Sequence, residues 1–481
     1  MKLCRIVSFA LAAGLALGVA AASAETQVNA QPVTFYQAEL DQQTNMLIVR
    51  ENRESGYVLM DAQLNKLTTE PYIYMDGKNG FLEVAVEEGV NTRGVIDTAG
   101  NPVMPMQYGD IDVLSDRWTI GVVLEAATED NYDYTTFFGQ KSFYLVSRFD
   151  VFYRGTLAGS FSRSEYKSGY ANGDFLTVRD RAGNYTAYDS QLTKSPIDVT
   201  SSSEYYDDYR AKTIYHVGSG MAAFTEGCTL TPDMVNKSIW TNGNRMTDLQ
   251  GNLIAELPCD TIYSFYGDYA YVRDNNKMYG MVDKTGNLVI PFVMDDDVYA
   301  SADRYFASGY QLVSVDGKLC WAAADGTITF TSDLSSSASY RNYGAFMSMQ
   351  GSDGKYTIVT PLGQLPTAYS EISGNSRSAS KLLVVQDEEK KSGVIGMAGE
   401  EVIPLTADYD SVYDLKVSYD GTLVLGELGY NNRLRDYVIY TIAYDETGLE
   451  VPTIDDGSWA CPSCNTRNTG KFCSECGTPK P

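Results

Sequence analysis

Four cysteines near the C-terminus have the spacing of a zinc site. Cys461 and Cys464 form one C-x-x-C pair, and Cys473 and Cys476 form a second pair eight residues later. Two such pairs surround one Zn²⁺ with four thiolates in a closed tetrahedron, which is typical of structural rather than catalytic zinc. Residues 455–481 are too few to bury a core, so we expect a zinc ribbon that the metal holds together. Outside the cell the same cysteines have an alternative, which is two disulfides.

The N-terminus has the three parts of a secretory signal peptide. Lys2 and Arg5 precede an apolar run over residues 6–22, and Ala22-Ser23-Ala24 forms a small-x-small cleavage site. We therefore expect residues 1–24 to be removed and the mature chain to be extracytoplasmic, either secreted or at the cell surface, without membrane insertion. An uncleaved signal would be the alternative, and Lys2 and Arg5 would then still keep the N-terminus inside and the rest outside.

The composition excludes some classes of partner. The 481 residues carry a formal net charge of −25 without a basic patch, so nucleic acid is not an expected ligand and anionic membranes would repel the chain. Besides Cys4 and the four C-terminal cysteines, the chain has Cys228, Cys259 and Cys320. This odd, widely spaced set does not form a disulfide framework, and we expect buried thiols, with a single disulfide between one pair as the alternative outside the cell.

The body of the chain is repetitive. Three segments, Arg93–Pro105, Tyr279–Pro291 and Ser392–Pro404, share the pattern Gly-x5-Gly-x4-Pro. Their first glycines lie 186 and 113 residues apart, which are five and three steps of about 37 residues. Weaker copies are found at 246–254, 321–328 and 358–365, and two more at 57–67, where Asn65 replaces the turn glycine, and at 186–192. Between residues 110 and 180 the repeat is hard to follow.

Each repeat has the pattern of a small β-meander. Residues 282–290 predict a hairpin in which Gly286 forms the turn and Pro291 stops the second strand, and residues 268–272 predict a preceding strand. We therefore expect an all-β array of β-meander repeats over residues 25–454, followed by the zinc ribbon over 455–481. The array is either propeller-like or open and superhelical. Ten or eleven units exceed the blades of one ordinary propeller, which favours two halves if the array closes.

The segment Lys277–Pro291 and its two good relatives resemble the WG-repeat (KWG-repeat) family of bacterial proteins. The tryptophan that names the repeat is replaced by Tyr279, Arg93 and Ser392, while Trp321 lies near the equivalent position of a weaker copy. The resemblance implies repeated β units and binding of other macromolecules, without an established reaction. The C-terminal segment resembles the short zinc ribbons found on many bacterial proteins.

Catalytic motifs are weak. His216 is the only histidine and lies among strand-like residues, without a nucleophile motif. The acidic clusters Asp295-Asp296-Asp297 and Asp408-x-Asp410 are expected to be solvated loop acids. The many tyrosines suit packing on strands.

We therefore expect no enzyme but an exported binding or scaffold protein whose repeat surface engages a protein or glycan. One alternative is an extracellular carboxylate-dependent hydrolase. Another is a zinc-ribbon docking module carried on a stalk of repeats.

Overall fold

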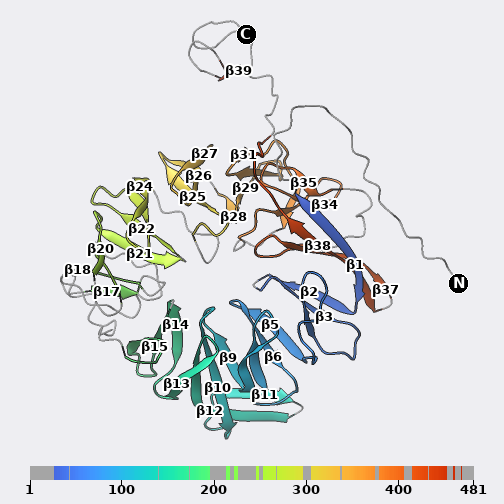
Figure 1. The fold of residues 1–481 in the computed structure, drawn as a ribbon, viewed down its shortest axis with the longest axis vertical. Coiled ribbons are helices and arrows are strands. Elements are labelled where there is room, and N and C mark those ends of the chain that lie inside the picture. The colour runs from blue at the N-terminus through green and yellow to red at the C-terminus, as the bar shows by residue number, and fades with distance from the viewer. Residues whose placement is uncertain are drawn as a thin grey trace, which may run out of the picture.

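The chain forms a ring of small antiparallel β-sheets that follow one another in chain order (Figure 1). The computed structural model describes residues 26–42, 44–138, 140–172, 174–194, 213–216, 221–225, 245–248, 253–266, 268–295, 305–335, 339–373, 379–405, 414–431, 433–451, 459–460 and 467–468. Within these ranges no helix is found, so none has the length and apolar character needed to cross a membrane. The expectation of an all-β array of repeats is confirmed.

Ten sheets, here called blades, make up the ring in the described part of the chain. The five blades from the N-terminal half have the following strands: β2 (Gln37–Asp41), β3 (Met46–Arg50), β4 (Val58–Met60); β5 (Tyr74–Lys78), β6 (Phe81–Ala85), β7 (Arg93–Ile96), β8 (Pro102–Tyr108); β9 (Asp110–Val113), β10 (Trp118–Ala126), β11 (Tyr134–Phe138), β12 (Gln140–Tyr153), β13 (Thr156–Ser162); β14 (Ser168–Asn172), β15 (Phe175–Arg179), β16 (Tyr185–Tyr188); β17 (Thr213–His216), β18 (Met221–Thr225), β19 (Arg245–Asp248), β20 (Leu253–Glu256).

The other five blades complete the ring. Their strands are β21 (Thr261–Tyr266), β22 (Tyr269–Arg273), β23 (Tyr279–Asp283), β24 (Leu288–Met294); β25 (Tyr310–Val315), β26 (Lys318–Ala323), β27 (Ile328–Ser335); β28 (Arg341–Tyr343), β29 (Phe346–Gln350), β30 (Tyr356–Thr360), β31 (Gly363–Gln364); β32 (Glu371–Ser373), β33 (Leu383–Gln386), β34 (Ser392–Ile395), β35 (Glu401–Ile403); β36 (Asp414–Val417), β37 (Leu423–Asn431), β38 (Leu434–Ala443) with β1 (Gln27–Phe35). In several blades, including β25–β27, Figure 1 shows the first strand nearest the centre and the last at the outer rim.

The two ends of the repeat region meet in one blade. Strand β1 pairs antiparallel with β38 from Gln27↔Ala443 to Phe35↔Arg435. The N-terminal strand thereby becomes the outermost strand of the last blade, and the ring closes. The expected division into two halves is wrong, because this pairing joins all the units in a single ring.

The core lies between neighbouring blades, because side chains alternate along each strand. On β33, Leu383 and Val385 pack toward the preceding blade, whereas Val384 packs toward the following one. The same alternation on β38 places Ile439 against the first blade and Val438 against the blade before. One blade cannot cover its own apolar faces, so each depends on its neighbours for burial.

The Gly-x5-Gly-x4-Pro pattern is explained by backbone packing at the outer strand. A Cβ atom on Gly94 would lie 2.8 Å from the carbonyl oxygen of Met104, and one on Gly280 would lie 2.8 Å from that of Ile290. Opposite each of these glycines the outer strand bulges. Arg93 and Val95 pair with Tyr108 and Met104, and the register shifts in the same way opposite Gly280. The first glycine therefore makes room for the bulge.

The proline of the pattern lies in that bulge. Pro291 lies within β24 and Pro105 within β8, and both are exposed. The expectation that Pro291 ends its strand is wrong. An outermost strand has no further neighbour on one side, so a residue without an N–H group is tolerated there and blunts the edge against unwanted pairing.

The second glycine forms a repeated hairpin turn. In the turn Asp97–Asn101, the Asp97 carboxylate accepts hydrogen bonds from the backbone N–H groups of Ala99 (2.9 Å) and Asn101 (2.8 Å). The Asn101 side-chain amide donates to the same carboxylate at 3.1 Å, and Gly100 has a φ of 83°. An aspartate thus caps the turn while the glycine takes the left-handed conformation.

The turn at 61–65 has the same hydrogen bonds with different residues. Asp61 accepts from Gln63 and Asn65, but the left-handed residue is Leu64, with a φ of 64°. The expectation that Asn65 replaces the glycine is wrong by one position, because Asn65 plays the part of Asn101. The aspartate and the asparagine four residues later stabilise the turn sufficiently for leucine to adopt the strained conformation.

The blade β9–β13 departs from the repeat and is enlarged. Its strands β10 and β12 pair over most of their lengths, and the additional strand β11 pairs with the start of β12. Trp118, which is fully buried, packs in its core with Ile120 and Phe149. This enlargement explains why the repeat is hard to follow between residues 110 and 180.

Candidate binding surfaces

The predicted zinc ligands Cys461, Cys464, Cys473 and Cys476 lie outside the described residues. Two short strands, β39 (Trp459–Ala460) and β40 (Arg467–Asn468), pair with each other on either side of the first C-x-x-C pair. Among the residues that the structure describes, no group of three or more His, Cys, Asp or Glu side chains could hold a metal ion. The ribbon and its zinc stay predictions.

The other residues singled out from the sequence do not converge in the described structure. His216 ends β17, where its backbone pairs with Ala222, and its side chain is not described. Asp296, Asp297, Asp408 and Asp410 lie outside the described residues. Asp295 is exposed just after β24, as expected for a solvated loop acid, and its carboxylate also accepts hydrogen bonds from the Ser314 hydroxyl and the Gly317 N–H. It caps the turn between β25 and β26.

Two of the three remaining cysteines are described and are buried, as expected. Cys259 precedes β21, and Cys320 lies in β26. Burial, together with the nearby Asp260 carboxylate, raises the pKa of the Cys259 thiol to about 12. A thiol in this state is a poor nucleophile at neutral pH, so Cys259 suits packing rather than catalysis. Cys228 lies outside the described residues.

The enlarged blade holds a nearly buried carboxylate between two arginines. Asp133 accepts hydrogen bonds from Arg163 at 2.8 Å and Arg181 at 3.1 Å, and also from the Val146 N–H at 3.0 Å. Burial raises the pKa of Asp133, but these hydrogen bonds outweigh burial and the pKa is lowered overall. The ionised carboxylate fixes the loop before β11 to the turns that follow β13 and β15.

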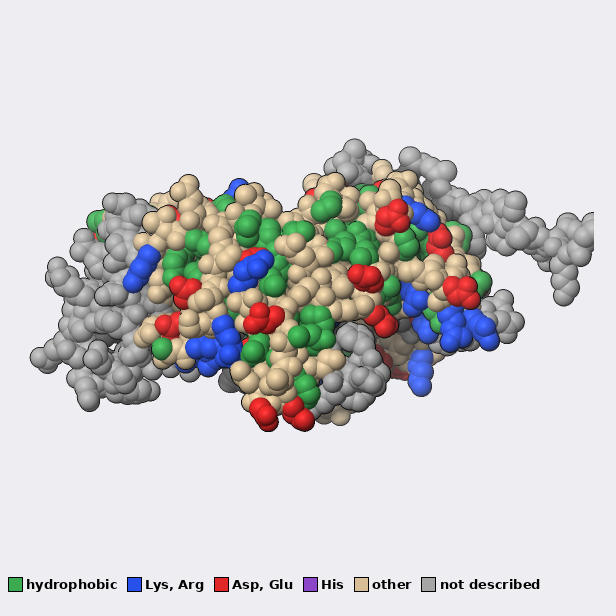
Figure 2. Space-filling view, turned by 90° about the horizontal axis from the view of Figure 1, so that it is seen from below, with side chains coloured by type: hydrophobic (Ala, Val, Ile, Leu, Met, Phe, Trp, Pro, Cys, Tyr) green, Lys and Arg blue, Asp and Glu red, His purple; other side chains and the backbone are tan. Residues whose placement is uncertain are grey.

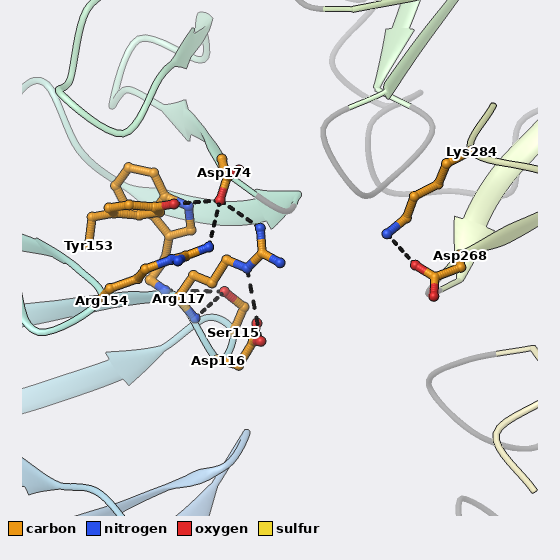
Figure 3. A network of polar contacts seen from close by, with 9 residues as sticks. Ser115, Asp116, Arg117, Tyr153, Arg154, Asp174, Asp268 and Lys284 are labelled. Carbon is orange, nitrogen blue, oxygen red and sulfur yellow. Dashed lines mark hydrogen bonds and ion pairs between the residues drawn. The ribbon is translucent and has the colours of Figure 1, made fainter.

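A second carboxylate joins the enlarged blade to its neighbour (Figure 3). Asp174, between β14 and β15, accepts hydrogen bonds from Tyr153 and from Arg117 (2.6 Å), and Arg154 lies 3.5 Å away. Burial raises the pKa of Asp174, but Tyr153 and the arginines lower it overall. The Lys284–Asp268 ion pair in the same view comes from the blade β21–β24. Because these groups are partly exposed, each ion pair adds little to stability and mainly orients the turns.

Asp112 differs from these carboxylates, because its pKa is raised. Partial burial of the carboxyl group raises its pKa, and the negative charge of the neighbouring Asp110 raises it further. The side chain is still in contact with water. The buried Tyr166 hydroxyl donates to Asp112 at 3.4 Å. Asp112 can therefore hold a proton at a higher pH than an ordinary aspartate. Sequence reasoning missed it, since no motif surrounds it.

One position of the repeat is exposed in most described blades, and its side-chain type differs from blade to blade. It is the first residue after the turn between the last two repeat strands, here called the rim position. In seven of the described copies it is occupied by Lys66, Pro102, Lys194, Leu253, Leu288, Ile328 and Glu401. Its side chain is exposed in each of these seven, whereas the equivalent residue of the copy at 358–365, Leu365, is buried. The residues that build the turn recur, whereas the residue that the turn presents to solvent varies.

Exposed hydrophobic side chains are common on the outer strands. They include Val28 on β1, Leu157 on β13 and Val293 on β24. Figure 2 shows the outer wall on the side of the enlarged blade, where hydrophobic side chains lie in small groups separated by acidic and basic ones. This wall presents mixed chemistry rather than one uniform patch.

The comparisons with known proteins support the repeat. Residues 248–277 and 279–318 match the family of the WG containing repeat. WG-type repeats are therefore present in this part of the chain, which includes the blade β21–β24. At the position of the family's tryptophan, Tyr279 is buried against Met281 and Tyr271. In the next blade Leu319 takes this position, and Trp321 lies two residues further on the same strand face.

No curated protein matches the sequence. Among solved structures, the computationally designed protein Ika8 is 9% identical, with 76% of this chain and 95% of that chain covered and a TM-score of 0.26. BamB from Moraxella catarrhalis is 11% identical, with coverages of 69% and 96% and a TM-score of 0.23. A eukaryotic initiation factor is 9% identical, with coverages of 78% and 95% and a TM-score of 0.32. At these scores the likenesses carry no weight for fold or function.

Proposed function

We propose that this protein is a non-catalytic binding or scaffold protein that acts outside the cytoplasm and engages a protein or glycan through its rim. The observation that supports this most is the rim position, which is exposed in seven described copies and varies among them from lysine through leucine to glutamate. A constant frame that presents variable side chains is how repeat proteins form broad binding surfaces without catalytic residues.

The residues that recur in the repeat pattern serve the fold. Gly94 and Gly280 make room for the bulge, Asp97 caps a turn, and Pro291 lies on the outer edge. These residues therefore leave no side chain for chemistry on a ligand. Recognition then falls to positions that the frame does not use, of which the rim position is the clearest.

The two ends of the chain complete the proposal. Residues 1–24 have the parts of an export signal, which supports action outside the cytoplasm. The C-terminal cysteines are proposed to hold one structural Zn²⁺ in a ribbon. In the alternative, the ribbon binds the partner and the ring only carries the ribbon.

The test is to mix the purified full chain with soluble glycans and with proteins from the cell surface of its source, and to follow both binding and the ligand. The proposal predicts saturable binding that leaves the ligand chemically unchanged. Ligand cleavage that continues beyond one event per chain and stops in Asp112→Asn would instead establish a hydrolase. Loss of all binding on removal of residues 455–481 would establish the ribbon as the docking part.

A further inference from the structure

Three consecutive blades have an aliphatic residue at the rim position. Leu253 is 51% exposed, Leu288 is 38% exposed and Ile328 is 37% exposed. Elsewhere in the described ring the exposed copies have lysine, proline or glutamate there, and Leu365 at the equivalent position of the blade β28–β31 is buried. Exposure of this size leaves much of each side chain in water, where it contributes nothing to folding and is available to a partner.

These three residues, here called the apolar arc, are brought together by the way the hairpins nest. A Cβ atom on Gly286 would overlap that of Ala255 on β20, and one on Gly326 would overlap the carbonyl oxygen of Val289 on β24. Each turn therefore lies directly on the outer strand of the blade before it. The strands β20, β24 and β27 follow one another along the outer rim in Figure 1.

Acidic side chains accompany the arc. Asp283 and Asp325 belong to the turns that precede Leu288 and Ile328, and Glu256 is exposed on the same strand as Leu253. Burial raises the pKa of Asp283, but hydrogen bonds from Thr285 and Asn287 lower it overall, and a hydrogen bond from Thr327 lowers the pKa of Asp325. Both carboxylates are therefore charged at neutral pH.

The one lysine in these turns does not offset this charge. Lys284 forms an ion pair with Asp268, which comes from the same blade (Figure 3). The net charge of the chain, −25, adds to the negative potential. A cationic partner is attracted to such a surface, and an anionic membrane is repelled.

We propose that the apolar arc docks a segment of a partner protein in which aliphatic side chains alternate with lysine or arginine. The aliphatic side chains would contact Leu253, Leu288 and Ile328, and the cationic ones would lie near Asp283, Asp325 and Glu256. Aliphatic residues at the arc favour a peptide over a glycan, because sugars are bound by stacking on aromatic rings. This inference rests on the proposed function, for which it names the surface and the class of partner.

The test uses the full chain and three short synthetic peptides, in which leucine alternates with lysine, leucine with glutamate, or serine with lysine. Fluorescence anisotropy gives each Kd. The test variant has Leu253→Ser, Leu288→Ser and Ile328→Ser together. The control variant has Val86→Ser, Leu157→Ser and Leu434→Ser, which are 45%, 55% and 41% exposed and lie outside the arc.

We expect the leucine–lysine peptide to bind the wild type and the control variant alike, and the other two peptides to bind at least about tenfold more weakly. The test variant should lose about tenfold or more in affinity, with unchanged circular dichroism. Leu288→Lys offers a second check, since Lys66 and Lys194 show that the fold accepts lysine at this position. It should weaken binding of the leucine–lysine peptide further than Leu288→Ser alone.

Four results would overturn the inference, three from the peptides and one from sedimentation. The first is that the leucine–lysine peptide binds the wild type and the test variant equally. The second is that the leucine–glutamate peptide binds the wild type as tightly as the leucine–lysine peptide does. The third is that the leucine–lysine peptide does not bind at all. A wild-type dimer in sedimentation that the test variant abolishes would assign the arc to a second copy of this chain, and would also overturn it. In each case binding of a cell-surface ligand elsewhere on the ring would leave the proposed function intact.

Discussion

The nesting of hairpins can be tested by a matched pair of glycine substitutions. Gly326 and Gly354 both have a φ of 84° and both occupy the left-handed position of a turn with the same backbone hydrogen bonds. They differ in their surroundings. A Cβ atom on Gly326 would overlap the Val289 carbonyl oxygen of the preceding blade, whereas one on Gly354 would meet nothing within 4 Å.

The expected magnitudes follow from this difference. A left-handed alanine costs about 1–2 kcal/mol, and the loss of unfolded-state freedom returns about 0.4–1 kcal/mol, so Gly354→Ala should destabilise by about 1 kcal/mol. Gly326→Ala has the same backbone cost and adds overpacking against a neighbouring backbone, which costs about 1–3 kcal/mol. Its total should be about 2–4 kcal/mol.

The assay is unfolding in guanidinium chloride followed by tryptophan fluorescence, because Trp118 and Trp321 are both buried. The difference between the two variants is read from the transition midpoints at a common slope. If Gly354→Ala destabilised the protein as much as Gly326→Ala, close contact between successive blades would not be the reason for glycine at residue 326.

Three further predictions concern acid, thiols and zinc. Hydrogen bonds lower the pKa of the turn carboxylates Asp61 and Asp283 in the folded protein, so their stabilisation is present above the unfolded value of about 4 and is lost as pH falls through the folded value. Stability should therefore drop below about pH 5, and Asp283→Asn should make this drop shallower in thermal unfolding at a series of pH values. Burial raises the pKa of Cys259, so iodoacetamide at pH 8 should label this thiol only after the protein unfolds. Peptide mass spectrometry would show the labelling, and rapid labelling of the native protein would contradict the burial of Cys259. Protein from the exported fraction should have a mass starting at Glu25 and one zinc per chain, and Cys461→Ser should lose the zinc without shifting the unfolding of the ring. A mass four hydrogens lighter, without zinc and with the other cysteines reduced, would instead mean two disulfides.

Much of the repeat could be predicted from the sequence, because its signals are local. The hairpin of β23 and β24 and the preceding strand β22 match the apolar period of two and the glycine turn. Where a turn has no glycine, the prediction fails. Lys277 and Lys390 also adopt positive φ, and the signal that could have found these turns is the aspartate three residues earlier.

The closure of the ring and the surface chemistry could not be predicted. Pairing of β1 with β38 joins residues about 400 positions apart, and no local pattern indicates which edge a terminal strand will cover. The rim position also could not be identified from the sequence, because it is recognised only when the turns of different blades are aligned by their shared hydrogen bonds. The apolar arc then emerges from Leu253, Leu288 and Ile328, which the sequence alone assigns to ordinary hairpin strands.

The central claim is that a constant ring presents a variable rim to a partner. The most direct measurement is to place a photo-crosslinking side chain at one rim position at a time in the full chain, including Pro102, Leu288 and Glu401, and to irradiate the protein in the presence of its cell-surface ligands. We predict crosslinks to the same partner from a continuous set of rim positions that includes Leu288. Crosslinks confined to residues 455–481, or equally efficient at every rim position, would contradict the claim.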